Sequence, residues 1–220
     1  MIGEDRNVEP SSLRQQDRAA MQRNRILGAA QSCFIECGFH AASMAEIAAS
    51  AGMSAGLIYR YFENKNAIIL AIIERQNEEV RADIASLRSA CDLVSRIVDL
   101  FESWKRHDPR AMNPVLFLEM AAESSRDAQI ARALDEAQRV RGGDFEAWIR
   151  QAAAQAGWDF CDEEVRTRAF ALQCFIEGLT VRAVREPDVD EEVLIQSLKL
   201  FLPHILPFPA NRIPHRKVKS

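Results

Sequence analysis

The chain has 220 residues, of which 48% are apolar and 27% are charged, a composition typical of a folded globular protein. This composition excludes a disordered chain, a collagen and a low-complexity array, and no apolar run reaches the roughly 18 residues of a transmembrane helix. The first residues lack the apolar stretch of a secretory signal, so we expect a cytoplasmic protein. Proline and glycine are scarce, which favours helices, and an odd count of five cysteines argues against a disulfide framework.

The net charge of −4 is spread unevenly along the chain. Residues 1–66 carry 7 basic and 7 acidic side chains, whereas residues 67–208 carry 17 basic and 25 acidic ones. Residues 209–220 form a basic tail with 4 basic and no acidic side chains. Because negative charge repels nucleic acid, any DNA contact belongs near the N-terminus or in the tail, and we expect the tail to be solvated.

Residues 1–20 have no periodic apolar face, and we interpret them as a flexible N-terminal arm that can extend the first helix at its end. Arg14 and Arg18 in this arm have two interpretations. They are either solvated, or they reach into an adjacent minor groove of DNA, as basic arms do.

An apolar stripe at helical spacing predicts the first strong helix from about Gln22 to Cys37. Gly38 follows it, where a left-handed C-terminal cap is expected. Cys33 and Cys37 lie one turn apart in the stripe, a spacing that suits either core packing or a metal ion. Because no histidine joins them, we expect core packing and no metal site. For the other three cysteines a redox-sensing thiol stays an alternative.

Two short helices follow. Ser43, with Glu46 three residues later, forms a capping box before the apolar run of the second helix. Gly52 ends that helix after about two turns, and Ser54 caps a third helix expected to reach Tyr61. Two short helices joined by a tight glycine-containing turn are typical of a helix-turn-helix.

The remainder of the chain also has helical patterning. A fourth helix is expected from about 64–65 to 87, with an apolar first half and a charged second half. No strand-like alternation bounded by turn signals appears, so the predicted fold is all-α, with a three-helix head and a five- or six-helix body. Apolar periodicity and breaks at proline, glycine and serine place the later helices at about 90–107, 112–124, 127–155, 162–185 and 190–205.

The segment ILGAAQSCFIECGFHAASMAEIAASAGMSAGLIYRYF at residues 26–62 resembles the DNA-binding domain of the TetR family of transcriptional regulators. The matching pieces are ILxAAxxxF, the Gly38–Phe39 pair, Ser43 before MAEIA, AGMSAG, and LIYRYF with Lys65. The resemblance implies a homodimer that binds an inverted-repeat operator in double-stranded DNA, and a small-molecule effector held in the body. It implies four parts: a flexible arm (1–20), a helix-turn-helix domain (21–66), an effector-binding and dimerisation domain (67–208) and the basic tail (209–220).

Several residues of the helix-turn-helix match positions that contact DNA in this family. Arg60 is expected to face the bases or phosphates, and small Ala55 lets the backbone approach DNA closely. Ala55 and Leu57 offer no side-chain hydrogen bonds to bases. We therefore expect sequence recognition to depend more than usual on the shape of the DNA. Core packing is the alternative for the two tyrosines, but both cannot face inward with Ile58 and Phe62. The residues to which the resemblance assigns DNA contacts are Ser43, Ser54, Gly56, Tyr59, Tyr61 and Lys65.

The resemblance places dimerisation on the last two long helices, whose apolar residues exceed what one buried stripe needs. Candidate ligand residues are aromatic, sulfur-containing or polar side chains of the middle helices. For the aromatic and sulfur-containing side chains the alternative is ordinary core packing, and for Glu177 it is a solvated position on the helix surface. A buried polar group among Glu119, Glu123, Gln173 and Glu177 would need a partner, which a cationic or hydrogen-bonding ligand supplies. The ligand candidates are Phe101, Trp104, Phe117, Met120, Trp148, Phe170, Cys174 and Glu177.

The chain contains no HExxH, GxSxG, GxGxxG or phosphate-loop motif, so we expect neither an enzyme nor a bound cofactor. We therefore predict a TetR-like regulator, more readily a repressor that its effector releases from DNA. The alternatives are a transcriptional activator, or a helical adaptor protein without a small-molecule effector. An enzyme that carries the three-helix head as one of its domains would need a set of catalytic residues elsewhere in the chain.

Overall fold

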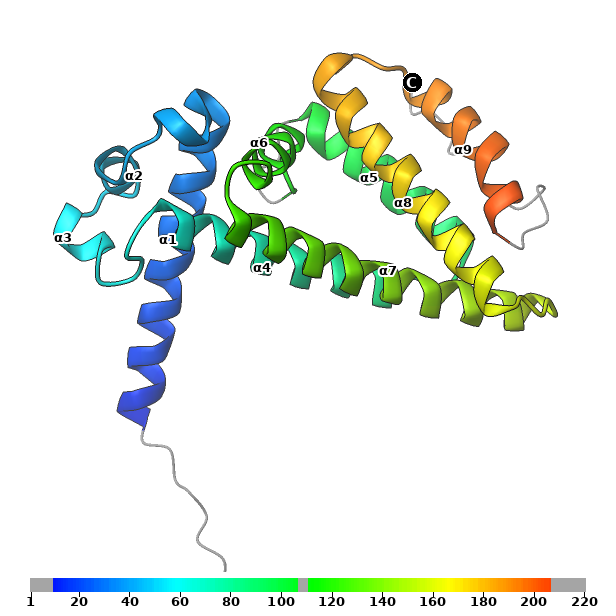
Figure 1. Ribbon diagram of the computed structural model, residues 1–220, viewed down its shortest axis with the longest axis horizontal. Coiled ribbons are helices and arrows are strands. Elements are labelled where there is room, and N and C mark those ends of the chain that lie inside the picture. The colour runs from blue at the N-terminus through cyan, green and yellow to red at the C-terminus, as the bar shows by residue number, and fades with distance from the viewer. Residues whose placement is uncertain (1–9, 107–110, 207–220) are drawn as a thin grey trace, which may run out of the picture. The chain divides into compact units, whose positions relative to one another are not determined.

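The computed structural model describes residues 10–106 and 111–206, with side chains from residue 17 onward apart from Ala90, and these residues form helices and no strand (Figure 1). The expected all-α fold is confirmed. Arg14's side chain and the basic tail lie outside the described part. None of the described helices is both long and apolar enough to cross a membrane. The helices are α1 (Pro10–Ala41), α2 (Met44–Ser50), α3 (Ala55–Ile58), α4 (Lys65–Ser86), α5 (Ala90–Lys105), α6 (Pro114–Ser124), α7 (Ala128–Ala156), α8 (Asp162–Arg185) and α9 (Glu191–Ile205).

The chain divides into two compact units, residues 1–72 and 73–220, which we call the N-terminal and the C-terminal unit. The division falls between Ile72 and Ile73, inside α4. Each unit has its own buried apolar residues.

In the N-terminal unit, α1 packs against α2, and α2 packs against α3 (Figure 1, blue to cyan). The core of this unit contains Ile26 and Phe34 of α1, Ile47 of α2 and Ile58 of α3, all fully buried. The spacing of Ile26 and Phe34 places both on one face of the helix, as the apolar stripe predicts. The short helices are therefore held by this shared core more than by their own length.

The first helix is longer than expected. It begins at Pro10 rather than near Gln22, because the arginine, glutamine and alanine residues before Gln22 favour a helix and no breaker separates them from it. At its other end, Gly38 has φ 81° and ψ 161°, which interrupts the helix before a final turn to Ala41. Gly38 thus makes a kink instead of the expected terminal cap, a conformation that glycine adopts without a Cβ clash.

In the C-terminal unit, α7 packs against both α6 and α8, and α5 packs against α8 and α9. Ser89, Asn113, Asp127 and Asp190 cap four of these helices, each accepting a backbone N–H with its side-chain oxygen. Buried apolar residues of α4, α5, α7, α8 and α9 form a core in this unit, with members such as Phe101, Phe145, Ile149, Leu172 and Leu198.

Candidate functional site

The second helix begins with a complete capping box. Ser43 Oγ accepts from the backbone N–H of Glu46 at 3.2 Å, and the Ser43 N–H donates to Glu46 Oε2 at 2.7 Å. Hydrogen bonds from the Ser43 hydroxyl and from the Ser43 backbone N–H to the Glu46 carboxylate hold the pKa of that carboxyl below its ordinary range. The Ser43 side chain lies on the exposed surface of the unit.

The turn between α2 and α3 needs glycine for its backbone. Gly52 has φ +60°, and its N–H donates to the Ala49 carbonyl at 2.9 Å. A Cβ at Gly52 would also lie 2.5 Å from Nη2 of Arg25, whose guanidinium comes from α1 and lies against the turn. Arg25 is a residue of this site that sequence reasoning missed, since nothing in a local pattern relates it to Gly52.

The third helix is a single capped turn with an open outer surface. Ser54 Oγ accepts from the Leu57 N–H at 3.3 Å. Ala55 and Gly56 are exposed, and no atom lies within 4 Å of the place where a Cβ of Gly56 would be. Neighbouring molecules can therefore approach the backbone of this turn closely.

The helix ends at Ile58, three residues before the expected end at Tyr61, because the next N–H groups turn back onto the carbonyls of Leu57 and Ile58. Tyr59 is 55% exposed and Arg60 is exposed, whereas Tyr61 is half-buried. Ile58 and Phe62 are buried, so the alternative of both tyrosines in the core does not occur. Leu57 is half-buried.

Lys65 has a structural role that the resemblance did not suggest. Its Nζ donates to the carbonyl oxygens of Phe39 at 2.6 Å and His40 at 3.1 Å, and it lies 4.7 Å from the centroid of the Phe39 ring. These contacts fasten the start of α4 to the carbonyls after the Gly38 kink. Only one N–H of the ammonium is left for another acceptor.

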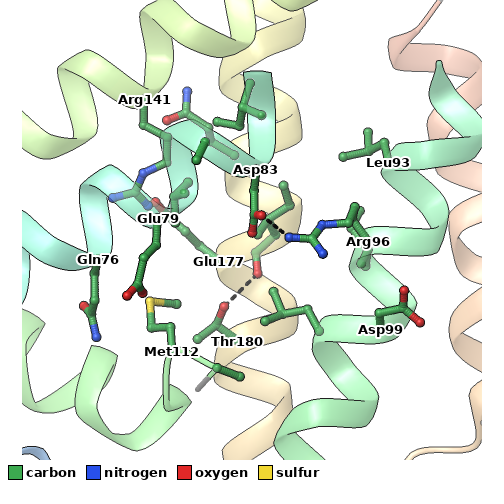
Figure 2. A pocket seen from close by; sticks show the side chains of 18 of the residues that line it. Gln76, Glu79, Asp83, Leu93, Arg96, Asp99, Met112, Arg141, Glu177 and Thr180 are labelled. Atoms are coloured by element: carbon green, nitrogen blue, oxygen red, sulfur yellow. Dashed lines mark hydrogen bonds and ion pairs between the residues drawn. The ribbon is translucent and has the colours of Figure 1, made fainter. Parts of the chain in front are cut away.

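The C-terminal unit contains a cavity of about 620 Å³, within the usual size range of small-molecule pockets (Figure 2). Its walls come from α4, α5, α7 and α8 together with residues 111–117. Apolar side chains such as Ile84, Ile97 and Phe145 form much of the surface. Polar lining residues are Gln76, Glu79, Asp83, Arg96, Asp99, Ser103, Arg141, Gln173, Glu177 and Thr180.

Several polar atoms of this cavity are buried without a hydrogen-bond partner. They are Nε2 of Gln76, Nε of Arg141 and Oε1 of Gln173. Burial lowers the pKa of the Arg141 guanidinium, and the charge of nearby Glu177 opposes that shift. An arginine nevertheless stays charged in proteins, so the cavity wall holds a half-buried cation whose Nε is fully buried.

The structure brings two of the eight ligand candidates, Phe117 and Glu177, to the cavity. Phe101, Met120 and Trp148 are buried outside its lining, and Trp104 donates its indole N–H to the Met112 carbonyl at 2.6 Å. The remaining two require correction, because Phe170 is 65% exposed and Cys174 is exposed on α8, outside the cavity.

Gln76 and Arg141 are lining residues that sequence reasoning missed. The one available signal was spacing along α4, where Gln76, Val80, Asp83 and Leu87 recur on one helical face.

Cys33, half-buried in α1, has its thiol pKa raised by burial, and the described residues contain no group of three or more metal-ligand side chains.

Two family models match the chain. The model of bacterial regulatory proteins of the tetR family matches residues 26–72, and that of the BetI-type transcriptional repressor, C-terminal, matches residues 91–207. The second match alone spans more than half of the chain. The chain belongs to the TetR family of transcriptional regulators. Members of this family bind DNA and small-molecule effectors, typically as dimers, and are regulators rather than enzymes.

Individual relatives agree with this membership. The HTH-type transcriptional regulator UidR of Escherichia coli K12 is 37% identical over 123 residues, which are 54% of this chain and 60% of UidR. The match thus spans less than two thirds of that relative. Salmonella enterica GusR has a similar structure, with a TM-score of 0.68 at 25% identity over 90% of this chain and 100% of GusR. A SmeT–triclosan complex gives a TM-score of 0.68 at 21% identity, with the same coverage, which shows the shared fold.

Proposed function

We propose that this TetR-family regulator is a homodimeric repressor that leaves its operator when a small molecule occupies the cavity of the C-terminal unit. The observation that carries the proposal is the cavity of about 620 Å³ with unpartnered polar atoms in its wall. Two comparisons support it: the C-terminal match is to a repressor model, and triclosan occupies a protein of this fold. Effector coupling in such proteins amounts to ~1–3 kcal/mol, or about 5- to 150-fold in affinity.

For operator binding, we propose that the exposed surface of α2, α3 and the following turn contacts DNA. Ser54 would donate its hydroxyl hydrogen to a phosphate while its oxygen caps α3, and the exposed Ser43 at the start of α2 would lie against the DNA backbone. Ala55 and Gly56 would let the backbone approach, and Tyr59 and Arg60 would supply polar contacts to phosphates or base edges. Tyr61 and Lys65 would contribute less, because each is partly committed to contacts within the N-terminal unit.

The dimer would form through α8 and α9. Phe170 on α8 is 65% exposed, and Val193 and Leu200 on α9 are 58% and 74% exposed. Phe175 and Phe201 stack at 4.2 Å between their centroids, which joins the two helices into one surface. A two-fold interface would remove this apolar surface from water and present two helix-turn-helix motifs to half-sites about 34–36 Å apart.

The test is selection of bound fragments from a genomic library by the purified protein, followed by affinity measurement across a salt series. We expect an enriched inverted repeat whose affinity falls steeply with salt, since phosphate contacts release counterions. A promoter–reporter assay with that operator then determines the sign of regulation. If the protein enhances transcription from that promoter, the proposal that it is a repressor is wrong. If the ligand-free protein shows no sequence preference, the proposal that it recognises a specific operator is wrong.

A further inference from the structure

The cavity wall contains two buried hydrogen-bond donors and one buried acceptor, Oε1 of Gln173, that have no partner among the described residues. Gln76 on α4 is only 6% exposed, and its amide Nε2 has no partner among the described residues. Nε of Arg141 on α7 is also buried without a partner there. Buried donors are normally satisfied, so two of them in one cavity wall indicate an acceptor group that a ligand brings.

The charged lining residues are the carboxylates Glu79, Asp83, Asp99 and Glu177 and the guanidinium groups of Arg96 and Arg141. Asp83 forms an ion pair with Arg96, and Glu79 lies 3.9 Å from Arg75. Arg141 has no ion pair within 4.0 Å among the described residues, although the charge of Glu177 is close enough to affect it. The cavity therefore has a half-buried guanidinium that lacks the direct anionic partner its planar fork accommodates.

Figure 2 shows Gln76, Glu79 and Arg141 on one side of the cavity, and the Asp83–Arg96 pair toward the other side. The lining elsewhere includes Phe117, Phe145 and Ile97, which suit an apolar ligand body. The site thus combines a polar side, which holds the two donors and the Glu79 carboxylate, with apolar walls.

We infer that the effector is an organic acid whose carboxylate accepts hydrogen bonds from Arg141 and Gln76, with its hydrocarbon body against the apolar walls. The inference rests on the proposed function, because it names the chemistry of the ligand of that same cavity. An amine would leave both buried donors unpartnered and would add a second cation beside Arg141. A neutral amide would satisfy the donors without neutralising the guanidinium.

The experiment measures binding of two matched probe series to the purified protein by isothermal calorimetry and thermal shift. The probes are 4-phenylbutyrate, 4-phenylbutyramide and 4-phenylbutylamine, and hexanoate, hexanamide and hexylamine. We expect each carboxylate to bind about tenfold more tightly than its amide and amine, the gain typical of a charge-assisted pair. The inference is overturned if an amine binds as tightly as its carboxylate, or if no carboxylate binds below about 10 mM.

Variants then assign the interaction to its residues. Arg141→Met and Gln76→Leu should weaken carboxylate binding about tenfold and about threefold, and Arg141→Lys should lose less than Arg141→Met. Arg139→Met is the matched control, because Arg139 lies on the same helix and pairs with Glu136 outside the cavity. Equal affinities of the Arg141→Met and Arg139→Met proteins would overturn the assignment. Circular dichroism checks that each variant is folded.

Operator binding of the unmodified protein separates this inference from the proposed function. If the protein binds an operator in a salt-dependent way but prefers amines to carboxylates, the proposal of a DNA-binding regulator stands and the inference of an organic-acid effector is wrong. If the protein binds carboxylates but no operator, the inference about the ligand stands and the proposal of a repressor is wrong.

Discussion

The ammonium of Lys65 donates a 2.6 Å hydrogen bond to the carbonyl oxygen of Phe39 and lies 4.7 Å from the centroid of that residue's ring. One side chain therefore stabilises both the backbone after the Gly38 kink and the first turn of α4. Lys65 therefore contributes to the stability of the N-terminal unit.

Replacing Lys65 by methionine should lower the free energy of unfolding by ~1.5–3 kcal/mol, since a charged hydrogen bond to a partly buried carbonyl is lost. Chemical denaturation measures this loss. Lys105→Met, which removes an i,i+3 ion pair on α5, is the control and should cost less than ~0.5 kcal/mol. Equal stability of the Lys65→Met and unmodified proteins would show that the two carbonyls do not depend on Lys65.

Gly52→Ala should destabilise the protein by ~1–2 kcal/mol, because an L-residue is strained at φ +60°. The new Cβ would also lie 2.5 Å from Nη2 of Arg25, the flexible end of a side chain that can move. The double variant Arg25→Ala/Gly52→Ala separates the two effects. If the double variant recovers most of the lost stability relative to Arg25→Ala alone, the contact and not the backbone strain dominates.

Gly56→Ala should leave stability unchanged or slightly raised, because nothing lies near the added methyl group and alanine favours a helix by ~0.5–1 kcal/mol. Operator affinity should nevertheless fall about tenfold, since the methyl group occupies the space where the backbone approaches DNA. Fluorescence anisotropy with a labelled operator measures this. Unchanged affinity would mean that the turn opening α3 lies away from the phosphates.

The Glu46 carboxylate should make stability depend on pH. Its folded-state pKa is lowered by hydrogen bonds with Ser43, so the stabilisation is present above the ordinary value of 4.5 and is lost as the pH falls through the lower folded-state value. The difference in Tm between the unmodified and Glu46→Gln proteins should therefore be largest at neutral pH and shrink below about pH 4.5. A constant difference would exclude this carboxylate as the titrating group.

Leu200→Arg should convert a dimer into a monomer and abolish operator binding, because it places a charge in the proposed α8–α9 interface at a position now 74% exposed. Light scattering after gel filtration gives the mass. Gln155→Arg, on the exposed end of α7, is the control and should remain dimeric. A Leu200→Arg protein of unchanged mass would place the interface elsewhere.

Local signals in the sequence were sufficient for much of the fold. The bounds of α8 (Asp162–Arg185) agree with the expected helix at 162–185, which runs from acidic residues to a stop before Pro187. The Ser43 cap and the turn at Gly52 were also visible, because they depend on residues a few positions apart. The start of α1 was predicted too late in the chain, because the residues before Gln22 have no apolar periodicity. Polar residues can nevertheless form an exposed helix.

The cavity was beyond such signals. Gln76 and Arg141 come from helices far apart in the sequence, and only tertiary packing turns both toward one space. Phe170 was expected inside because it is aromatic, yet it is 65% exposed on α8 and lies outside the cavity.

The hydrogen bond from the Trp104 indole to the Met112 carbonyl also gives the protein a built-in optical reporter. Met112 lines the cavity, whereas Trp148 is buried in the core and Trp158 is mostly exposed to water. Indole emission shifts with the polarity around the ring, so a ligand that displaces water beside Met112 should shift the emission of Trp104 more than that of the other two. A Trp158→Phe protein would remove the water-exposed background and allow cavity occupancy to be followed in real time without a label.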